Sequence, residues 1–151
     1  AVIVDIVKTV LDNSSYQAWN ITAGTPSSTE PWRTLVLAAV STANPGASGF
    51  AKSAVGKNVT VFYVSNRTHD GEDATRDNMA KLGFPMGGNI DTLLTQDEHK
   101  DWTSKKGTRF AYIAKHYRVL LLLGDNFGDF VDAYKGSLDA RQKTYDNYAK
   151  H

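Results

Sequence analysis

The sequence has no cysteine, only two methionines and four prolines, and no large excess of charge of either sign. Without cysteine the chain can form no disulfide and no thiolate metal site, which fits an oxidising compartment as well as the cytosol. Its apolar runs are far shorter than the ~20 residues that cross a bilayer, and no signal-peptide pattern appears, so we expect no transmembrane segment in this chain. The net charge of +1 gives no reason to expect a nucleic-acid polymer or a membrane surface as partner.

What remains is typical of a folded domain: 151 residues, of which 41% are hydrophobic and 22% are charged. This length supports one domain with a buried core, so residues 1–151 are predicted to form a single domain. Because Ala1-Val2-Ile3-Val4 already has the pattern of a strand, we expect the chain to be a mature or trimmed segment.

Short apolar runs alternate with longer helical patterns along the chain. The predicted strands are residues 2–5, 59–64 and 119–123, with a further short strand at 89–94. The predicted helices are residues 29–42, 47–55, 70–82, 104–117 and 138–151. The alternation predicts an α/β fold, a Rossmann-like parallel sheet flanked by helices. Residues 12–28 show no regular pattern and are predicted to be a small insertion after the first strand.

Two carboxylates follow the apolar run at 121–123, after Gly124. Ligands of open α/β sheets bind beyond the carboxyl ends of the strands, so Asp125 and Asp129 are positioned to hold a hard cation through oxygen. The alternative is that Asp125 begins a turn and Asp129 is a surface residue of the next helix.

Polar residues also end the other strands: Asp5 after the first, and Ser65 after the second. Lys106 opens a later helix, and if the strands are parallel neighbours these groups meet at one rim. A carboxylate nucleophile, a hydroxyl, an ammonium and an acidic metal-binding pair are the groups that phosphoryl transfer requires. Taken singly, each has a structural explanation as a strand end, a helix cap or a solvated lysine.

Three aromatic residues, Tyr16, Trp19 and Trp32, lie between the first two strands. Their faces could stack on a nucleobase, or they could pack the insertion onto the core. Both interpretations stay open on the sequence alone.

Several motifs, in this order along the chain, resemble the bacterial class C acid phosphatases of the haloacid dehalogenase superfamily. The matching segments are residues 9–14, 62–67, 74–79, 82–85 and 124–130. The resemblance implies a Rossmann-like core, Mg²⁺ as cofactor, phosphomonoester substrates such as 5′-nucleotides, and often a homodimer. It also implies a periplasmic, outer-membrane-anchored or secreted protein that is longer than this chain at both ends.

Carried over to this sequence, the resemblance makes Asp5 the nucleophile that forms an aspartyl-phosphate. The implied phosphate-binding residues are Ser65, Asn66, Arg67 and Lys106. The implied metal ligands are Asp5, the backbone carbonyl of Val7, Asp125 and Asp129. Tyr16 and Trp19 are the aromatic candidates for the substrate.

The first motif departs from the family pattern Asp-x-Asp-x-Thr, because this chain reads Asp5-Ile6-Val7-Lys8-Thr9. Val7 stands where the family has the aspartate that protonates the leaving oxygen and later deprotonates water. Loss of a general acid/base costs about 10²–10⁴ in rate, least for substrates with good leaving groups. Lys8 replaces the usual glutamate, and it could contact phosphate or point to solvent.

Two functions therefore remain open: a Mg²⁺-dependent phosphatase weakened at Val7, or a phosphate- or nucleotide-binding module of the same fold that no longer turns over substrate. A separate explanation of the departure is an error in the sequence at residue 7, since Asp and Val are nearly equal in size.

Overall fold

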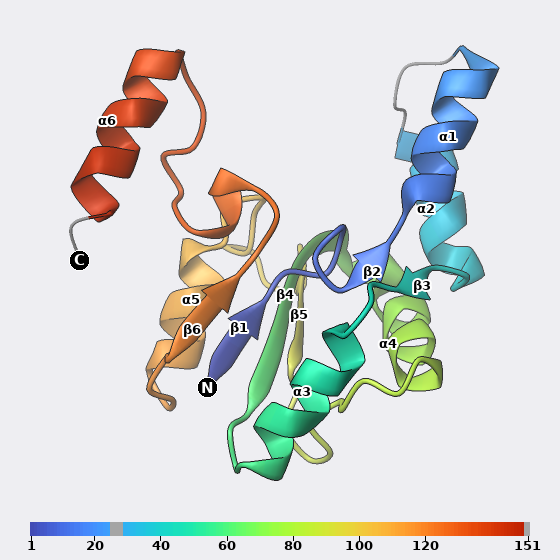
Figure 1. The fold of residues 1–151 in the computed structure, drawn as a ribbon, viewed down its shortest axis with the longest axis horizontal. Coiled ribbons are helices and arrows are strands. Elements are labelled where there is room, and N and C mark those ends of the chain that lie inside the picture. The colour runs from blue at the N-terminus through green and yellow to red at the C-terminus, as the bar shows by residue number, and fades with distance from the viewer. Residues whose placement is uncertain (25–28, 150–151) are drawn as a thin grey trace.

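A parallel four-stranded sheet forms the centre of the molecule, in the order β5-β4-β1-β6 (Figure 1). The structure is a computed structural model that describes residues 1–24 and 29–149. The strands are β1 (Val2–Val4), β4 (Val61–Thr68), β5 (Leu93–Gln96) and β6 (Leu121–Leu123). The predicted α/β fold with a parallel sheet is thus confirmed.

Alternate residues of the strands face two separate cores, as the two-residue period of a strand requires. On one face Val2, Val4 and Tyr63 pack with residues of α3 (Ala47–Gly56) and α4 (Glu72–Lys81). On the other face Ile3 and Phe62 pack with residues of α5 (Gly107–Ala114). The sheet is therefore covered on both faces, which explains why its strands are almost continuously apolar.

The register of the sheet brings the ends of β1 and β6 level, beside the middle of β4. Val4 of β1 is the partner of both Tyr63 and Leu123, and the amide of Asp5 donates to the carbonyl of Leu123 at 2.8 Å. Asp5 and the turn after β6 therefore lie side by side, at the carboxyl ends where α/β sheets bind ligands. Beyond this level β4 continues to Thr68, further than the predicted end at residue 64.

The region between β1 and α3 contains more regular structure than predicted. Helix α1 (Ser14–Ala23) occupies most of the stretch expected to be irregular, and Gly24 ends it in a left-handed conformation (φ 61°). The sequence pattern is weak because only Tyr16 and Asn20 of this helix are buried. Residues 25–28 of the predicted loop lie outside the described residues.

The helix predicted at residues 29–42 is too long by four residues. Helix α2 (Thr29–Ala38) ends before Ala39, which has a left-handed φ of 52°. The chain then forms β3 (Thr42–Ala43), which pairs antiparallel with β2 (Leu11–Asp12). This small two-stranded sheet connects the insertion to the loop that follows β1.

Other boundaries also differ from the prediction. The predicted helix at 70–82 is a short 3₁₀ helix (His69–Gly71) followed by α4, and the fourth strand lies at 93–96 instead of 89–94. Ser104 does not cap α5, which begins only at Gly107 and has Lys106 in the preceding position.

After β6 the chain forms a 3₁₀ helix (Phe127–Asp129) and then α6 (Leu138–Tyr148), which stands apart from the sheet in Figure 1. No residue of α6 is buried, and the Ser137 hydroxyl caps the helix by accepting the amide of Ala140. Among the described helices, none has the length and apolar character needed to cross a membrane.

Candidate functional site

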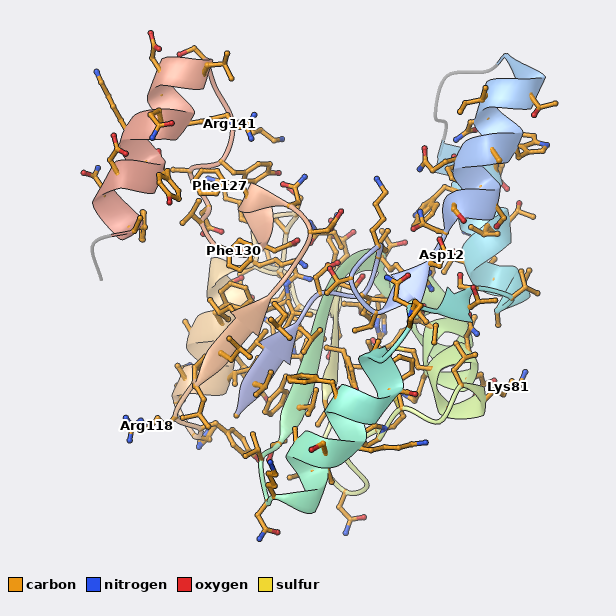
Figure 2. All side chains as sticks on the ribbon, in the orientation of Figure 1. Asp12, Lys81, Arg118, Phe127, Phe130 and Arg141 are labelled. Atoms are coloured by element: carbon orange, nitrogen blue, oxygen red, sulfur yellow. The ribbon has the colours of Figure 1, made fainter. Side chains whose placement is uncertain are left out.

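A cavity of about 360 Å³ opens beyond the carboxyl ends of β1, β4 and β6. Side chains crowd this end of the sheet, in the space between the loop at Phe127 and the strand at Asp12 (Figure 2). The loops after the strands, α2 and the segment before α5 all contribute to its wall. The lining residues are Asp5, Val7, Lys8, Trp32, Asn66, Arg67, Ser104, Asp125, Asn126, Gly128, Asp129 and Tyr134.

One buried ammonium group connects two carboxylates on the floor of this cavity. Lys106 Nζ donates to Asp5 Oδ1, lies 2.8 Å from Asp129 Oδ1, and donates to the carbonyl of Val64 at 2.6 Å. Lys106 is 2% exposed and Asp5 is 8% exposed. Burial raises the pKa of Asp5, while the charge of Lys106 opposes that rise. The neighbouring Lys105 is exposed, so Lys106 is the lysine that faces the site, as predicted.

The carboxylates of Asp5, Asp125 and Asp129 form an acidic trio, with one oxygen of each within 4.8 Å of the others. Such a set of oxygens suits a hard divalent cation. The turn brings Asp129 inward: the amide of Asn126 donates to Asp129 Oδ2 at 3.0 Å, and Gly128 N donates to Asn126 Oδ1 at 2.9 Å. Asp129 is therefore buried, and the alternative of a surface residue on a helix is wrong for this position.

Gly124 is required by this turn. A Cβ atom at residue 124 would collide with the Cβ of Asp129, so no larger residue fits without moving the carboxylate. The abrupt end of the apolar run at a glycine, visible in the sequence, thus has a direct structural cause.

The loop after β1 is held by its own backbone. The amides of Val10 and Leu11 both donate to the carbonyl of Ile6, at 3.0 and 2.9 Å, and the amide of Lys8 donates to the carbonyl of Leu11 at 2.8 Å. Lys8 takes a left-handed φ of 66°, which is uncommon for a residue with a side chain. This rigid loop presents Val7 and Lys8 on the cavity wall.

The three predicted phosphate-binding residues of β4 are placed differently from one another. Ser65 is fully buried behind the wall, where its hydroxyl accepts the amide of Arg67 at 3.2 Å. Asn66 lines the cavity and donates to the carbonyl of Ser104 at 2.9 Å.

Arg67 lines the cavity although it is only 2% exposed. Its Nη1 donates to the Thr75 hydroxyl at 3.0 Å, but Nε and Nη2 have no partner among the described residues. Its guanidinium carbon lies 5.7 Å from the ring centre of Trp32, and burial lowers its pKa to about 10, so it stays charged at neutral pH. A buried cation with two unpaired nitrogens on a cavity wall is suited to an anion.

Arg109 is an important residue of this region that the sequence analysis missed. It is fully buried and donates to the carbonyls of Ser65 (2.5 Å) and Thr103 (2.8 Å) and to Asn66 Oδ1 (2.6 Å). Burial lowers its pKa to about 10. Its spacing of three residues from Lys106, which places both on one side of α5, was the available signal.

We expect Arg109→Met to lower the free energy of unfolding by about 3 kcal/mol, because the buried carbonyl of Ser65 and two partly buried oxygens lose a charged donor. Urea unfolding measures this. The matched control is Arg118→Met, since that side chain extends from the surface (Figure 2) and its loss should change stability by less than about 0.5 kcal/mol. Equal losses in the two variants would contradict the bracing role of Arg109.

The aromatic residues that were predicted to contact substrate lie at two different sites. Tyr16 is buried, with its ring centre 5.1 Å from that of Trp32 and 6.2 Å from that of Trp19. Tyr16 and Trp19 line an apolar groove between α1 and α2, apart from the cavity. Trp32 and Tyr134 are the aromatic residues on the cavity wall.

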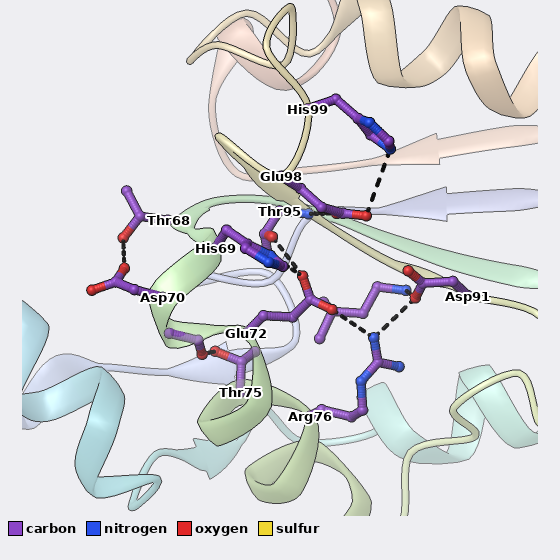
Figure 3. Close-up of polar contacts among 12 residues, drawn as sticks. Thr68, His69, Asp70, Glu72, Thr75, Arg76, Asp91, Thr95, Glu98 and His99 are labelled. Atoms are coloured by element: carbon purple, nitrogen blue, oxygen red, sulfur yellow. Dashed lines mark hydrogen bonds and ion pairs between the residues drawn. The ribbon is translucent and has the colours of Figure 1, made fainter.

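A second polar cluster, centred on Glu72, joins α4 to β5 (Figure 3). Glu72 accepts from the Thr95 hydroxyl at 2.7 Å and from Arg76 at 2.8 Å, and it lies 3.0 Å from His69 Nδ1. His69, Glu72 and Glu98 lie close enough to share a metal ion. The hydrogen bonds that Glu72 accepts, however, already offset the negative charge of Glu72. The cluster therefore serves as a structural connection between the helix and the sheet.

The hydrogen bond to Glu72 raises the pKa of His69 above its ordinary 6.5. A raised histidine pKa means that its stabilising effect is complete below pH 6.5 and is lost as the pH rises through the folded-state value. We expect His69→Gln to destabilise the protein more at acidic than at alkaline pH. Thermal unfolding across this range tests it, with exposed His116→Gln as control, and a difference that does not vary with pH would contradict it.

Fold and cavity together define a class of protein: a doubly covered parallel sheet that gathers carboxylates, an ammonium and a guanidinium beyond its strand ends. The family model described as HAD superfamily, subfamily IIIB (acid phosphatase) matches residues 1–148, and the chain belongs to this family.

Two solved structures agree with this assignment. The class C acid phosphatase from Bacillus anthracis has a TM-score of 0.87 and 30% sequence identity over the whole chain. A second structure of that enzyme, with tungstate bound, has a TM-score of 0.86 and 29% identity. The chain spans 62% of the length of each of these structures.

Proposed function

We propose that this chain is a Mg²⁺-dependent phosphomonoesterase that acts through an aspartyl-phosphate on Asp5, weakened by Val7. The observation that carries the proposal is Lys106 between Asp5 and Asp129, below a wall that holds the unpaired nitrogens of Arg67. The tungstate bound to the related enzyme supports it, because tungstate is a tetrahedral oxyanion like phosphate.

Each residue has a role in this proposal. The carboxylates of Asp5, Asp125 and Asp129, with the carbonyl of Val7, hold Mg²⁺, whose positive charge offsets the charge of the phosphoryl group. The second carboxylate oxygen of Asp5 attacks phosphorus.

The remaining polar groups bind the phosphate. Arg67 and Asn66 contact it from the wall, and the charge of Lys106 favours the ionised form of Asp5. Ser65 accepts the amide of Arg67 and so orders the end of β4; a direct contact between its hydroxyl and phosphate remains a prediction.

For the substrate we propose a 5′-nucleotide. Trp32 and Tyr134 offer ring faces on the cavity wall, and Tyr16 and Trp19 extend the aromatic group behind Trp32. The family membership also supports a secreted, periplasmic or membrane-anchored protein and a homodimer, both of which we include in the proposal.

The test is hydrolysis of an aryl phosphate by the purified chain, with Mg²⁺ and after chelation. We expect metal-dependent release of the phenol, which Asp5→Asn abolishes. An Asp125→Asn variant should need more Mg²⁺ for the same rate. Release that does not require Asp5 would contradict the proposed chemistry.

Val7 also favours a second candidate, a binding module that holds a phosphate ester without converting it. In that case calorimetry would detect binding of a nucleotide that depends on Arg67, while neither the unchanged chain nor Val7→Asp would release any phenol.

A further inference from the structure

We propose that this chain stores the phosphoryl group: aspartyl-phosphate on Asp5 forms readily from acyl and aryl phosphates and is then hydrolysed slowly. The inference rests on the proposed function and adds to it a substrate class and a long-lived phosphorylated state. It comes from the chemistry of the cavity wall around Asp5.

No residue on the described part of the wall is suited to take a proton from water. Lys8 and Arg67 are cations, and a protonated cation is not a base. Tyr134 is a phenol, which carries its proton at neutral pH. The described lining residues include no histidine.

The acids of the wall have other roles in the proposed function. Asp5 carries the phosphoryl group, Asp129 is paired with Lys106 at 2.8 Å, and the exposed Asp125 is assigned to the cation. Val7, two residues after Asp5, lines the same cavity, and its hydrocarbon side chain cannot accept a proton.

The loop that carries Val7 does not offer a substitute. Its backbone hydrogen bonds hold Ile6 to Val10 and Leu11, and Asn44 Nδ2 donates to the carbonyls of residues 8 and 9, both at 3.0 Å. The Thr9 hydroxyl donates to Asp5 Oδ2 at 3.2 Å and so is directed at the nucleophile. Because the backbone of this loop is fixed by these hydrogen bonds, no other described group on it can replace the missing base.

The absence of a base affects the two chemical steps differently. In the first, an Asp5 oxygen forms a bond to phosphorus while the bond to the leaving oxygen breaks; a carboxylate or phenolate departs with the electron pair and needs no proton. In the second, water must form a bond to phosphorus and lose a proton as the Asp5 oxygen departs. The missing base slows only this second step, by about 10²–10⁴, so the phosphorylated chain accumulates.

The experiment is intact-mass analysis of the full chain after mixing with acetyl phosphate and Mg²⁺, followed by removal of the reagent. We expect one added phosphoryl group, absent in Asp5→Asn and released by hydroxylamine as an acyl phosphate should be. In Val7→Asp the lifetime of this species should fall by about 10²–10⁴. Val7→Asn, which has a similar size but no basic oxygen, is the matched control and should keep the long lifetime.

The failures of the two proposals are distinguishable. Continuous release of phosphate at the same rate by the unchanged chain and by Val7→Asp, without added mass, would overturn the stored intermediate and the weakening by Val7, but would leave the phosphatase activity through Asp5 intact. Absence of both added mass and product in every variant would overturn the proposed function itself. A phosphoryl group that persists in Asp5→Asn would overturn the assignment to Asp5.

Discussion

Replacing Val7 with aspartate is expected to raise the turnover of an alkyl phosphate by about 10²–10⁴. An alkoxide is a poor leaving group and needs a proton as the bond to phosphorus breaks, which valine does not supply. Val7 already lies on the cavity wall and its loop is fixed by backbone hydrogen bonds, so an aspartate of similar size would point the same way. Steady-state kinetics with matched alkyl and aryl phosphates would measure the gain.

Comparing the alkyl and the aryl phosphate distinguishes acid catalysis by residue 7 from an effect of the substitution that accelerates both substrates equally. The carboxyl group introduced by Val7→Asp would act on the first step with alkyl esters and on water attack with both, so the gain in the first-step rate should be larger for the alkyl ester. Val7→Asn controls for size and polarity. If Val7→Asn accelerates turnover as much as Val7→Asp, proton transfer is not what residue 7 lacks.

The position of the site could be predicted because it depends on strand ends. Asp5 and Asp125 each follow a short apolar run, and parallel neighbouring strands necessarily bring their carboxyl ends to one edge. The structure brings both to that edge, with Lys106 bridging Asp5 and Asp129 beside them. An apolar run that ends at a polar residue is a local sequence pattern. It can therefore be recognised without knowing how the strands and helices pack together.

What the sequence does not reveal is decided by contacts between distant segments. Arg109 is an arginine in a helix, and only its burial against the end of β4 gives it two of its three acceptors, on Ser65 and Asn66. Trp32 reaches the wall because α2 packs beside the 3₁₀ helix that ends at Gly71, where Val36 lies close to the backbone. Helix α1 escaped prediction because its stability comes from the few side chains that pack on its neighbours, not from a repeating apolar face.

The electrostatic arrangement of the cavity explains why one lysine matters so much. Asp5 and Asp129 are both buried, and the only ammonium that reaches them in the described chain is that of Lys106. Burial and the nearby charge of Asp129 raise the pKa of Asp5, while Lys106 acts in the opposite direction. Lys106 therefore favours the ionised form of Asp5, the proposed nucleophile.

Removing that side chain should have the largest effect on stability. We expect Lys106→Met to lower the free energy of unfolding by about 3–5 kcal/mol, because two buried carboxylates lose their cation. The loss should shrink at acidic pH, since burial raises the pKa of Asp5 and a proton can then neutralise this carboxylate in place of Lys106. Urea unfolding as a function of pH measures both effects.

A divalent cation provides the decisive comparison for this variant. If the acidic trio binds Mg²⁺, the metal should restore part of the lost stability, because a ligand that binds only the folded state stabilises it in proportion to the logarithm of its concentration. The neighbouring residue gives the matched control, Lys105→Met, which should behave like the unchanged protein because that side chain is exposed. Recovery of Lys106→Met by Mg²⁺, absent when Asp125 is also changed to Asn, would tie the buried pair and the metal ligands to one site; an equal response with Asp125→Asn would place the cation elsewhere.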